Sequence, residues 1–185
     1  MNTTTIVVGA LVLLVLFVIT QYNRLVRLNV RVDESFSQIE VQLQRRADLI
    51  PNLVETVKGY AAHESATFEK VVAARAAATS AKGVADVAAA DGQLTQALRG
   101  LLAVSEAYPD LKASANFIAL QEELSSTENK VGFARQYYND NVRSLNEAIK
   151  TFPGNSFAGI AKVVARDFYV VDNPGKRDVP NVSFS

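Results

Sequence analysis

The fold is decided by residues 6–43, which read IVVGALVLLVLFVITQYNRLVRLNVRVDESFSQIEVQL. No charged residue occurs from Asn2 to Asn23, so about 20 residues can cross a hydrocarbon core of roughly 30 Å as a helix. Beyond Arg24, apolar or small residues recur at every third or fourth position, which predicts a helix with one apolar stripe. We therefore expect a membrane anchor that leads directly into a long amphipathic helix.

A cleaved signal peptide would also be apolar and N-terminal. However, Asn2 to Thr5 contains no Lys or Arg, where a secretory signal would be basic, and the apolar segment is long. The exit from Thr20 to Arg24 offers no small-x-small cleavage site. These features favour an uncleaved anchor.

The cations beside the apolar segment predict its orientation. Arg24, Arg27 and Arg31 all follow the segment, and no Lys or Arg precedes it. Because cytoplasmic flanks collect Lys and Arg, we expect a single-pass protein with its N-terminus outside and its bundle in the cytoplasm.

The apolar stripe predicts one helix from Arg24 to about Ala78, interrupted by Pro51. A proline inside a helix cannot donate to the carbonyl four residues back, here Ala47, so a kink is expected. Alternatively, Asp48 caps a new helix and Pro51 lies in its first turn.

Five stripe residues emerge directly from the anchor, and we predict that they mediate lateral self-association. The alternative is that the last helix and the tail cover them within one chain, as ordinary bundle packing. These residues are Leu25, Leu28, Val32, Phe36 and Ile39.

Three further helices are expected downstream. One carries Leu94 and Leu98 and stops at Pro109, and a longer one runs from Phe117 to Phe152. A short one runs from Ser156, its predicted N-cap, to about Asp167.

No strand pattern is present. We predict an all-α fold, in which an N-terminal transmembrane helix continues into an antiparallel helical bundle with one very long, proline-kinked first helix. The expected divisions are an anchor (1–23), a bundle (24–168) and an extended tail (169–185).

Residues that could carry catalysis are scarce, since the chain has one His and no Cys. His63-Glu64 begins a zinc-protease pattern, but Thr67 stands where the second His is needed. Neither Glu-x-x-His copy of a di-iron bundle is present. We expect no enzyme, no catalytic residue, no metal and no cofactor. The balance of 19 basic and 19 acidic residues gives no reason to expect nucleic acid as a partner.

Polar residues form a second stripe beside the apolar one on two of the expected helices. A solvated face is the simpler interpretation. The alternative is a hydrogen-bonded network between the two helices, in which alanine at Asn139 would cost more than about 1 kcal/mol. The polar stripes include Gln38, Gln42, Arg45, Asp48 and Asn52, and later Arg135, Asn139 and Asn146.

Several long motifs occur in order along the chain. They are Tyr22 to Val26, Arg45 to Val54, Val57 to Tyr60 with His63-Glu64, Glu106 to Lys112, Arg135 to Pro153, and Pro180 to Phe184. Together they resemble the LemA family over nearly the whole chain. Where that family often has two adjacent phenylalanines near its end, this chain has Phe168-Tyr169.

The resemblance implies a single-pass protein of the bacterial inner membrane with a helical bundle and no defined enzymatic activity. A related branch, MamQ, is implicated in forming magnetosome membranes, so membrane organisation or remodelling is a candidate role. The motif residues carry over only as structural or interaction positions. They are Arg45, Arg46, Asp48, Pro51, Asn52, Tyr60, His63, Glu64, Arg135, Asn139 and Asn146.

Two classes of function then compete. The first is a membrane-anchored helical scaffold or assembly protein, whose partners are the lipid bilayer and either copies of itself or another membrane protein. The second is an envelope regulatory or sensor subunit that binds a ligand or a membrane protease. A deep apolar pocket with converging polar groups would favour the second class.

Overall fold

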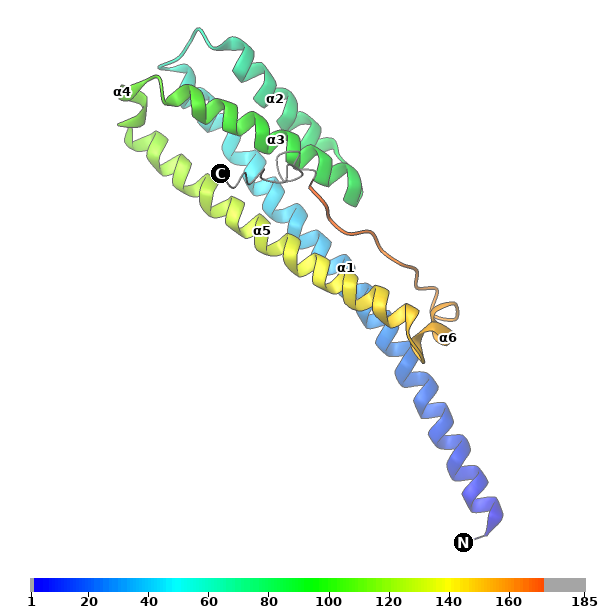
Figure 1. Ribbon diagram of the computed structural model, residues 1–185. Helices are drawn as coiled ribbons and strands as arrows, with labels where there is room; N and C mark the ends of the chain where they lie inside the picture. The colour runs from blue at the N-terminus through cyan, green and yellow to red at the C-terminus, as the bar shows by residue number, and fades with distance from the viewer. Residues whose placement is uncertain (1, 172–185) are drawn as a thin grey trace, which may run out of the picture. The chain divides into compact units, whose positions relative to one another are not determined.

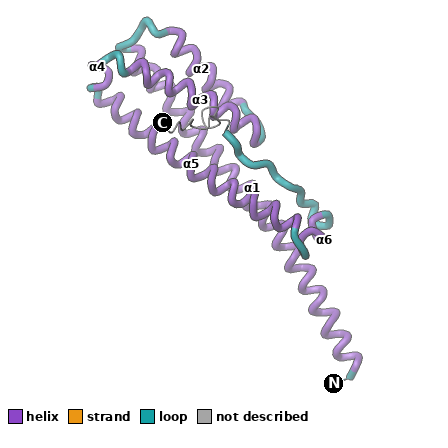
Figure 2. The backbone as a smooth tube through the Cα atoms, viewed as in Figure 1, coloured by secondary structure: helices purple, strands orange, loops and turns teal. Residues whose placement is uncertain are grey.

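The computed structural model describes residues 2–171, and these residues form six helices and no strand (Figures 1 and 2). The all-α prediction is confirmed. The helices are α1 (Thr3–Lys58), α2 (Ser65–Ser80), α3 (Val84–Ser105), α4 (Pro109–Lys112), α5 (Ala115–Lys150) and α6 (Gly154–Ala158).

Helix α1 is continuous through Pro51, so Asp48 does not begin a new helix. The helix is long and apolar enough to cross a membrane, with a mean hydropathy of 2.6 in an 18-residue window of which 0% is buried. It ends at Lys58, well before the predicted end near Ala78. Gly59 follows directly, as is common after the last turn of a helix.

Residues Glu40 to Phe133, with Tyr169 to Val171, form one compact unit, called unit 2 here. Helices α2 and α3 lie side by side within it (Figure 1). The turn between them contains Gly83 at φ 78°, a left-handed conformation that favours glycine. The core of unit 2 combines residues of α1, α2, α3, α4 and α5, among them Leu53, Val57, Phe68, Leu94, Leu101, Leu111, Phe117 and Leu124.

Residues 2–39, together with Ala134 to Phe168, form the other unit, unit 1. Here the apolar stripe of α1 packs against α5, and the ring of Phe36 lies 5.7 Å from that of Tyr138 between centroids. Within this one chain, Leu25, Val32 and Ile39 are buried and Leu28 and Phe36 are half-buried. The stripe is thus covered within the chain, at Phe36 by α5 rather than by the expected last helix and tail. Self-association itself stays a prediction.

The short helix expected from Ser156 to about Asp167 is mostly absent. Only α6 forms, and its N-cap is Pro153 rather than Ser156. From Gly159 to Val171 the described chain contains no helix (Figure 2). The backbone near Arg166 bonds to side chains of α5 instead of to itself, which explains why the apolar spacing did not produce a helix.

The expected tail begins at Tyr169, which is buried in unit 2. The tail from residue 172 on, including Pro180 to Phe184, lies outside the described residues.

Candidate functional site

A buried guanidinium lies at the centre of a charged network in unit 2. Arg46, on α1, is only 3% exposed. Its Nη1 donates to Oδ1 of Asp91 and to Oγ1 of Thr95, both at 3.0 Å. Its Nη2 lies 2.8 Å from Oε2 of Glu128 on α5. One side chain of α1 therefore holds both α3 and α5.

The second oxygen of Asp91 extends the network to the chain that follows unit 1. The hydroxyl of Tyr169 donates to Oδ2 of Asp91 at 2.8 Å, and both side chains are buried. Gly92 makes room for this chain, since a Cβ there would lie 3.3 Å from Cγ1 of Val171. The first residues of the tail thus pack against α3.

Burial determines how much each of these charged pairs contributes to the stability of the fold. Taking Arg46 and Asp91 out of water is costly, and the cost is offset only while each charge keeps its partners. By contrast, the neighbouring Arg45 pairs with Glu123 at 3.1 Å with both side chains about half exposed, and such pairs contribute little. Of the two adjacent arginines, Arg46 is the one that can fix the register of the helices.

A cavity of about 320 Å³ lies beside the network, between α3 and α5. Its lining combines opposite charges, amides and leucines, a mixture suited to a small molecule with both charged and apolar parts. The lining residues are Arg46, Thr95, Leu98, Arg99, Leu102, Gln121, Leu124, Ser125, Glu128 and Asn129.

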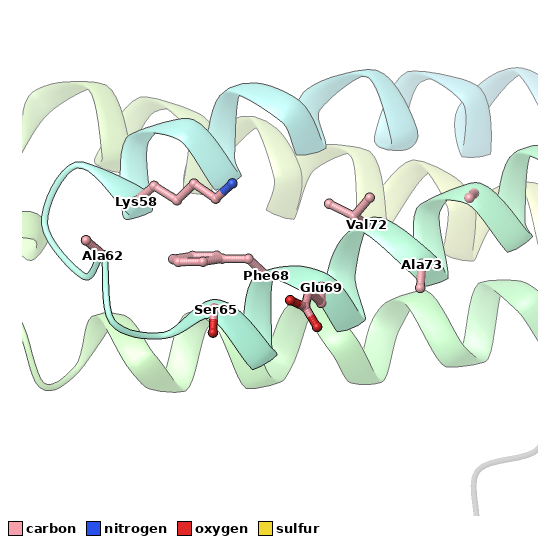
Figure 3. A pocket seen from close by; sticks show the side chains of 8 residues that line it. Lys58, Ala62, Ser65, Phe68, Glu69, Val72 and Ala73 are labelled. Carbon is pink, nitrogen blue, oxygen red and sulfur yellow. The ribbon is translucent and has the colours of Figure 1, made fainter.

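A second hollow, of about 610 Å³, is lined by the end of α1 and by α2 (Figure 3). Lys58 and Phe68 face each other across it, with Nζ 5.5 Å from the ring centroid. Glu69 and Val72 line the same hollow. It is an open groove with few polar groups.

In unit 1, polar side chains of α5 form hydrogen bonds with the backbone of the chain that follows α6. Asn146 donates from Nδ2 to the carbonyl of Arg166 and accepts from the amide of the same residue, both at 2.9 Å. The hydroxyl of Tyr138 donates to the carbonyl of Asp167 at 2.9 Å. Two side chains of α5 thus hold two consecutive residues of the returning chain.

The side chain of Arg166 then continues to α1. Its Nη2 lies 2.6 Å from Oδ1 of Asp33 and donates at 3.1 Å to Oδ1 of Asn29. Asn146 of α5 is therefore linked to α1 only indirectly. The link is Arg166, which belongs to neither of the two long helices.

Burial raises the pKa of the Tyr138 phenol above its ordinary value of 10.0. The positive charge of Arg166 opposes this shift, and the carboxylates of Asp167 and Asp33 add to it. The phenol is therefore held in its protonated form, in which it donates to Asp167.

The remaining motif residues lie at less buried positions. Asp48 is exposed and accepts from Nε2 of Gln44 at 2.8 Å. Within residues 2–171, no group of three or more His, Cys, Asp and Glu is placed to hold a metal ion. Pro51, Asn52, Tyr60 and His63 are exposed, and Glu64, Arg135 and Asn139 are half-buried.

Sequence reasoning missed seven side chains of these networks: Asn29, Asp33, Asp91, Thr95, Glu128, Arg166 and Tyr169. A signal for Asp91 exists, because Val87, Asp91, Leu94 and Leu98 follow the three-and-four spacing of a buried face. A carboxylate on such a face needs a buried cation as its partner.

The LemA family model matches residues 35–184. The chain is similar to magnetosome protein MamQ 2 of Paramagnetospirillum magneticum, at 25% identity over 175 residues, covering 80% of this chain and 64% of the relative. It is also similar to magnetosome protein MamQ of Magnetospirillum gryphiswaldense, at 25% identity over 82% of this chain and 65% of that protein. Protein LemA of Metamycoplasma hominis is 26% identical over 137 residues, covering 74% of this chain and 63% of that protein. The chain spans less than two thirds of the length of each of these relatives.

Proposed function

The chain belongs to the LemA family, and from that premise we propose that it is a membrane-anchored helical scaffold or assembly protein without catalysis. It acts through contacts with copies of itself or with another membrane protein. Two of its relatives are named as magnetosome proteins, which supports membrane organisation as a candidate role.

The feature that carries this proposal is the dual character of α1. Its N-terminal window is apolar and 0% buried, whereas the same helix supplies Leu25 and Ile50 to the two cores. A helix that is apolar on all sides requires an apolar solvent. Lipid around the first part of α1 would hold the packed part at the bilayer.

The three arginines after the apolar window support a topology with the N-terminus outside and the bundle in the cytoplasm, at the inner membrane. Protease added to spheroplasts tests this topology. Bundle fragments that survive intact until the membrane is opened support it, and digestion from outside contradicts it.

Contacts with a partner would use side chains that the chain itself leaves uncovered. Phe133 and Tyr137 lie four residues apart on α5, so they share a face, and they are 74% and 50% exposed. Since Leu25, Val32 and Ile39 are buried, this pair is better placed than the stripe to meet a neighbour.

Cysteine crosslinking in native membranes tests the scaffold. The chain contains no Cys, so Phe133→Cys or Tyr137→Cys introduces a single reactive site. Lys82→Cys, in the exposed turn after α2, is the matched control. We expect adducts from the α5 positions and few from Lys82→Cys. If no adduct forms from any of the three cysteine positions, the scaffold proposal is contradicted.

The cavity beside Arg46 favours a second candidate, a sensor subunit that binds a small ligand. Its opposite charges and leucines suit amphipathic amino acids and short peptides, which serve as the probes. A ligand that binds the folded state raises the unfolding temperature. Leu98→Trp, which would fill the cavity, should abolish that rise. If no probe raises the unfolding temperature, the sensor candidate is rejected and the scaffold is the one proposal that remains.

A further inference from the structure

The segment that joins α5 to the returning chain has an unusual composition for a solvent-exposed connection. No charged residue occurs from Thr151 to Ala161, and Lys150 and Lys162 stand at its two ends. Phe152 and Ile160 are 82% and 68% exposed. An uncharged stretch with exposed large apolar side chains and flanking lysines is the pattern of a segment that lies in a membrane interface.

This segment touches the apolar part of α1 directly. The ring of Phe157, on α6, packs edge-on against Phe17, with centroids 6.2 Å apart. Phe17 belongs to the stretch of α1 that carries no charge. Gly154 lies beside Leu25, since a Cβ on it would be 3.7 Å from Cδ2 of that leucine. The segment therefore lies alongside α1 from Leu25 to Phe17.

The position of Phe17 along α1 sets how deep its neighbour Phe157 lies in the bilayer. At 1.5 Å per residue, Phe17 lies about 10 Å along the helix from Arg24. Interfacial helices bury their apolar face about 5–10 Å below the headgroup boundary. With Arg24 among the headgroups, Phe157 reaches the upper part of the hydrocarbon.

The backbone of the segment suits this depth, where unpaired amides are costly. The amides of Asn155 and Ser156 donate to Thr151 and Pro153, at 2.9 and 3.1 Å. The amides of Ala161 and Lys162 donate to Phe157 and Gly159, at 2.9 and 3.2 Å. Pro153 has no amide hydrogen to place.

We propose that residues 151–161 form a second membrane contact, an interfacial foot that rests in the boundary of the bilayer crossed by α1. The proposal rests on the membrane anchor of the proposed function. Phe152, Phe157 and Ile160 enter the acyl region, while Lys150 and Lys162 reach the headgroups, where anionic lipid attracts them. Unit 1 is then held to the bilayer at two points.

Fluorescence quenching in vesicles tests the foot with the full-length chain. Single cysteines at Phe152 and Ile160 are labelled with an environment-sensitive fluorophore, and both positions are exposed enough to accept it. Leu13→Cys reports on the anchor. Phe133→Cys, an equally exposed phenylalanine of α5, is the matched control. The vesicles contain phosphatidylcholine and phosphatidylglycerol, with nitroxide lipids labelled near the headgroup or deep in the acyl chain.

We expect the labels at Phe152 and Ile160 to lose emission with the shallow nitroxide, the label at Leu13 with the deep one, and the label at Phe133 with neither. An unquenched pair at 152 and 160 beside a quenched Leu13 overturns the foot and leaves the anchor intact. A blue-shifted but unquenched pair would mean that a protein covers these side chains, which also overturns it. An unquenched Leu13 would refute the anchor itself. Unfolding temperatures of the labelled chains, compared with the parent, verify that each is folded.

Discussion

The side-chain Nε of Arg75 lies 2.8 Å from the carbonyl oxygen of Ala47. Ala47 is the residue whose carbonyl Pro51 cannot reach, because proline lacks an amide hydrogen. A side chain of α2 thus supplies a donor that α1 lacks at this position. This contact explains how α1 runs through Pro51 without ending, and it ties α2 to α1 inside unit 2.

Arg75→Met should lower the free energy of unfolding by about 1–2 kcal/mol, since a buried carbonyl loses its donor. In a Pro51→Ala background the loss should be smaller, because the amide of residue 51 can then donate to Ala47. Urea unfolding of the full chain in detergent, followed by circular dichroism, gives the four values of the cycle. Additive effects of the two substitutions would contradict this role for Arg75.

Arg46→Met should destabilise the protein by about 3–5 kcal/mol, because Asp91 would remain buried without its cation. Arg45→Met, one residue earlier, removes a half-exposed pair and should cost less than about 1 kcal/mol. Thermal unfolding of the two variants measures the difference. Adding Asp91→Leu to Arg46→Met should recover part of the loss, and equal costs for the two arginines would show that the network is not buried in solution.

Tyr138→Phe should change how stability depends on alkaline pH. The pKa of Tyr138 is raised in the folded state, so this group contributes stability that is fully present below the unfolded pKa near 10 and is lost as pH rises through the folded pKa. The parent protein should therefore lose more stability than Tyr138→Phe over this alkaline range. Melting curves at a series of pH values test this, and parallel losses in both proteins would exclude Tyr138 as the titrating group.

Gly154→Ala should cost at least about 2 kcal/mol, because a Cβ at this position would overlap the carbonyl oxygen of Ala148. Gly159→Ala is the matched control, since nothing lies within 4 Å of its Cβ position. The control should be neutral or more stable by about 0.4–1 kcal/mol. Unfolding temperatures of the two variants decide the comparison, and a tolerated alanine at residue 154 would mean that the turn after α5 is looser than described.

Periodicity predicted most of the helices because a buried stripe repeats every three or four residues. It failed at the end of α1 because Phe68 and Val71 of α2 continue the spacing of Val57 and Ala61 across the break at Gly59. Such a pattern marks which residues are buried, but it does not show where the chain folds back.

The candidate site was predictable only in part, and for a different reason. Arg46 and Asn146 were singled out by motif, but their partners Asp91 and Arg166 are distant in sequence. Hydrogen bonds from α5 to the backbone around Arg166 leave no periodic pattern in the amino-acid sequence. The segment around Arg166 has helical spacing, yet its backbone is bound by Asn146 and Tyr138, and that competition is visible only in three dimensions.

An anchored scaffold must occur in membranes either as several copies together or beside a partner protein, and counting its copies in membranes can decide this. Chains carrying a single fluorophore at Lys82→Cys, expressed at native level, are extracted with their surrounding lipid in polymer-bounded nanodiscs. Photobleaching steps are then counted, and co-extracted proteins are identified. We predict that the chain is recovered in nanodiscs with several steps per particle, or with a second membrane protein present. Single-step particles without any other protein, or a chain absent from the nanodiscs, would show that the protein is not an anchored scaffold.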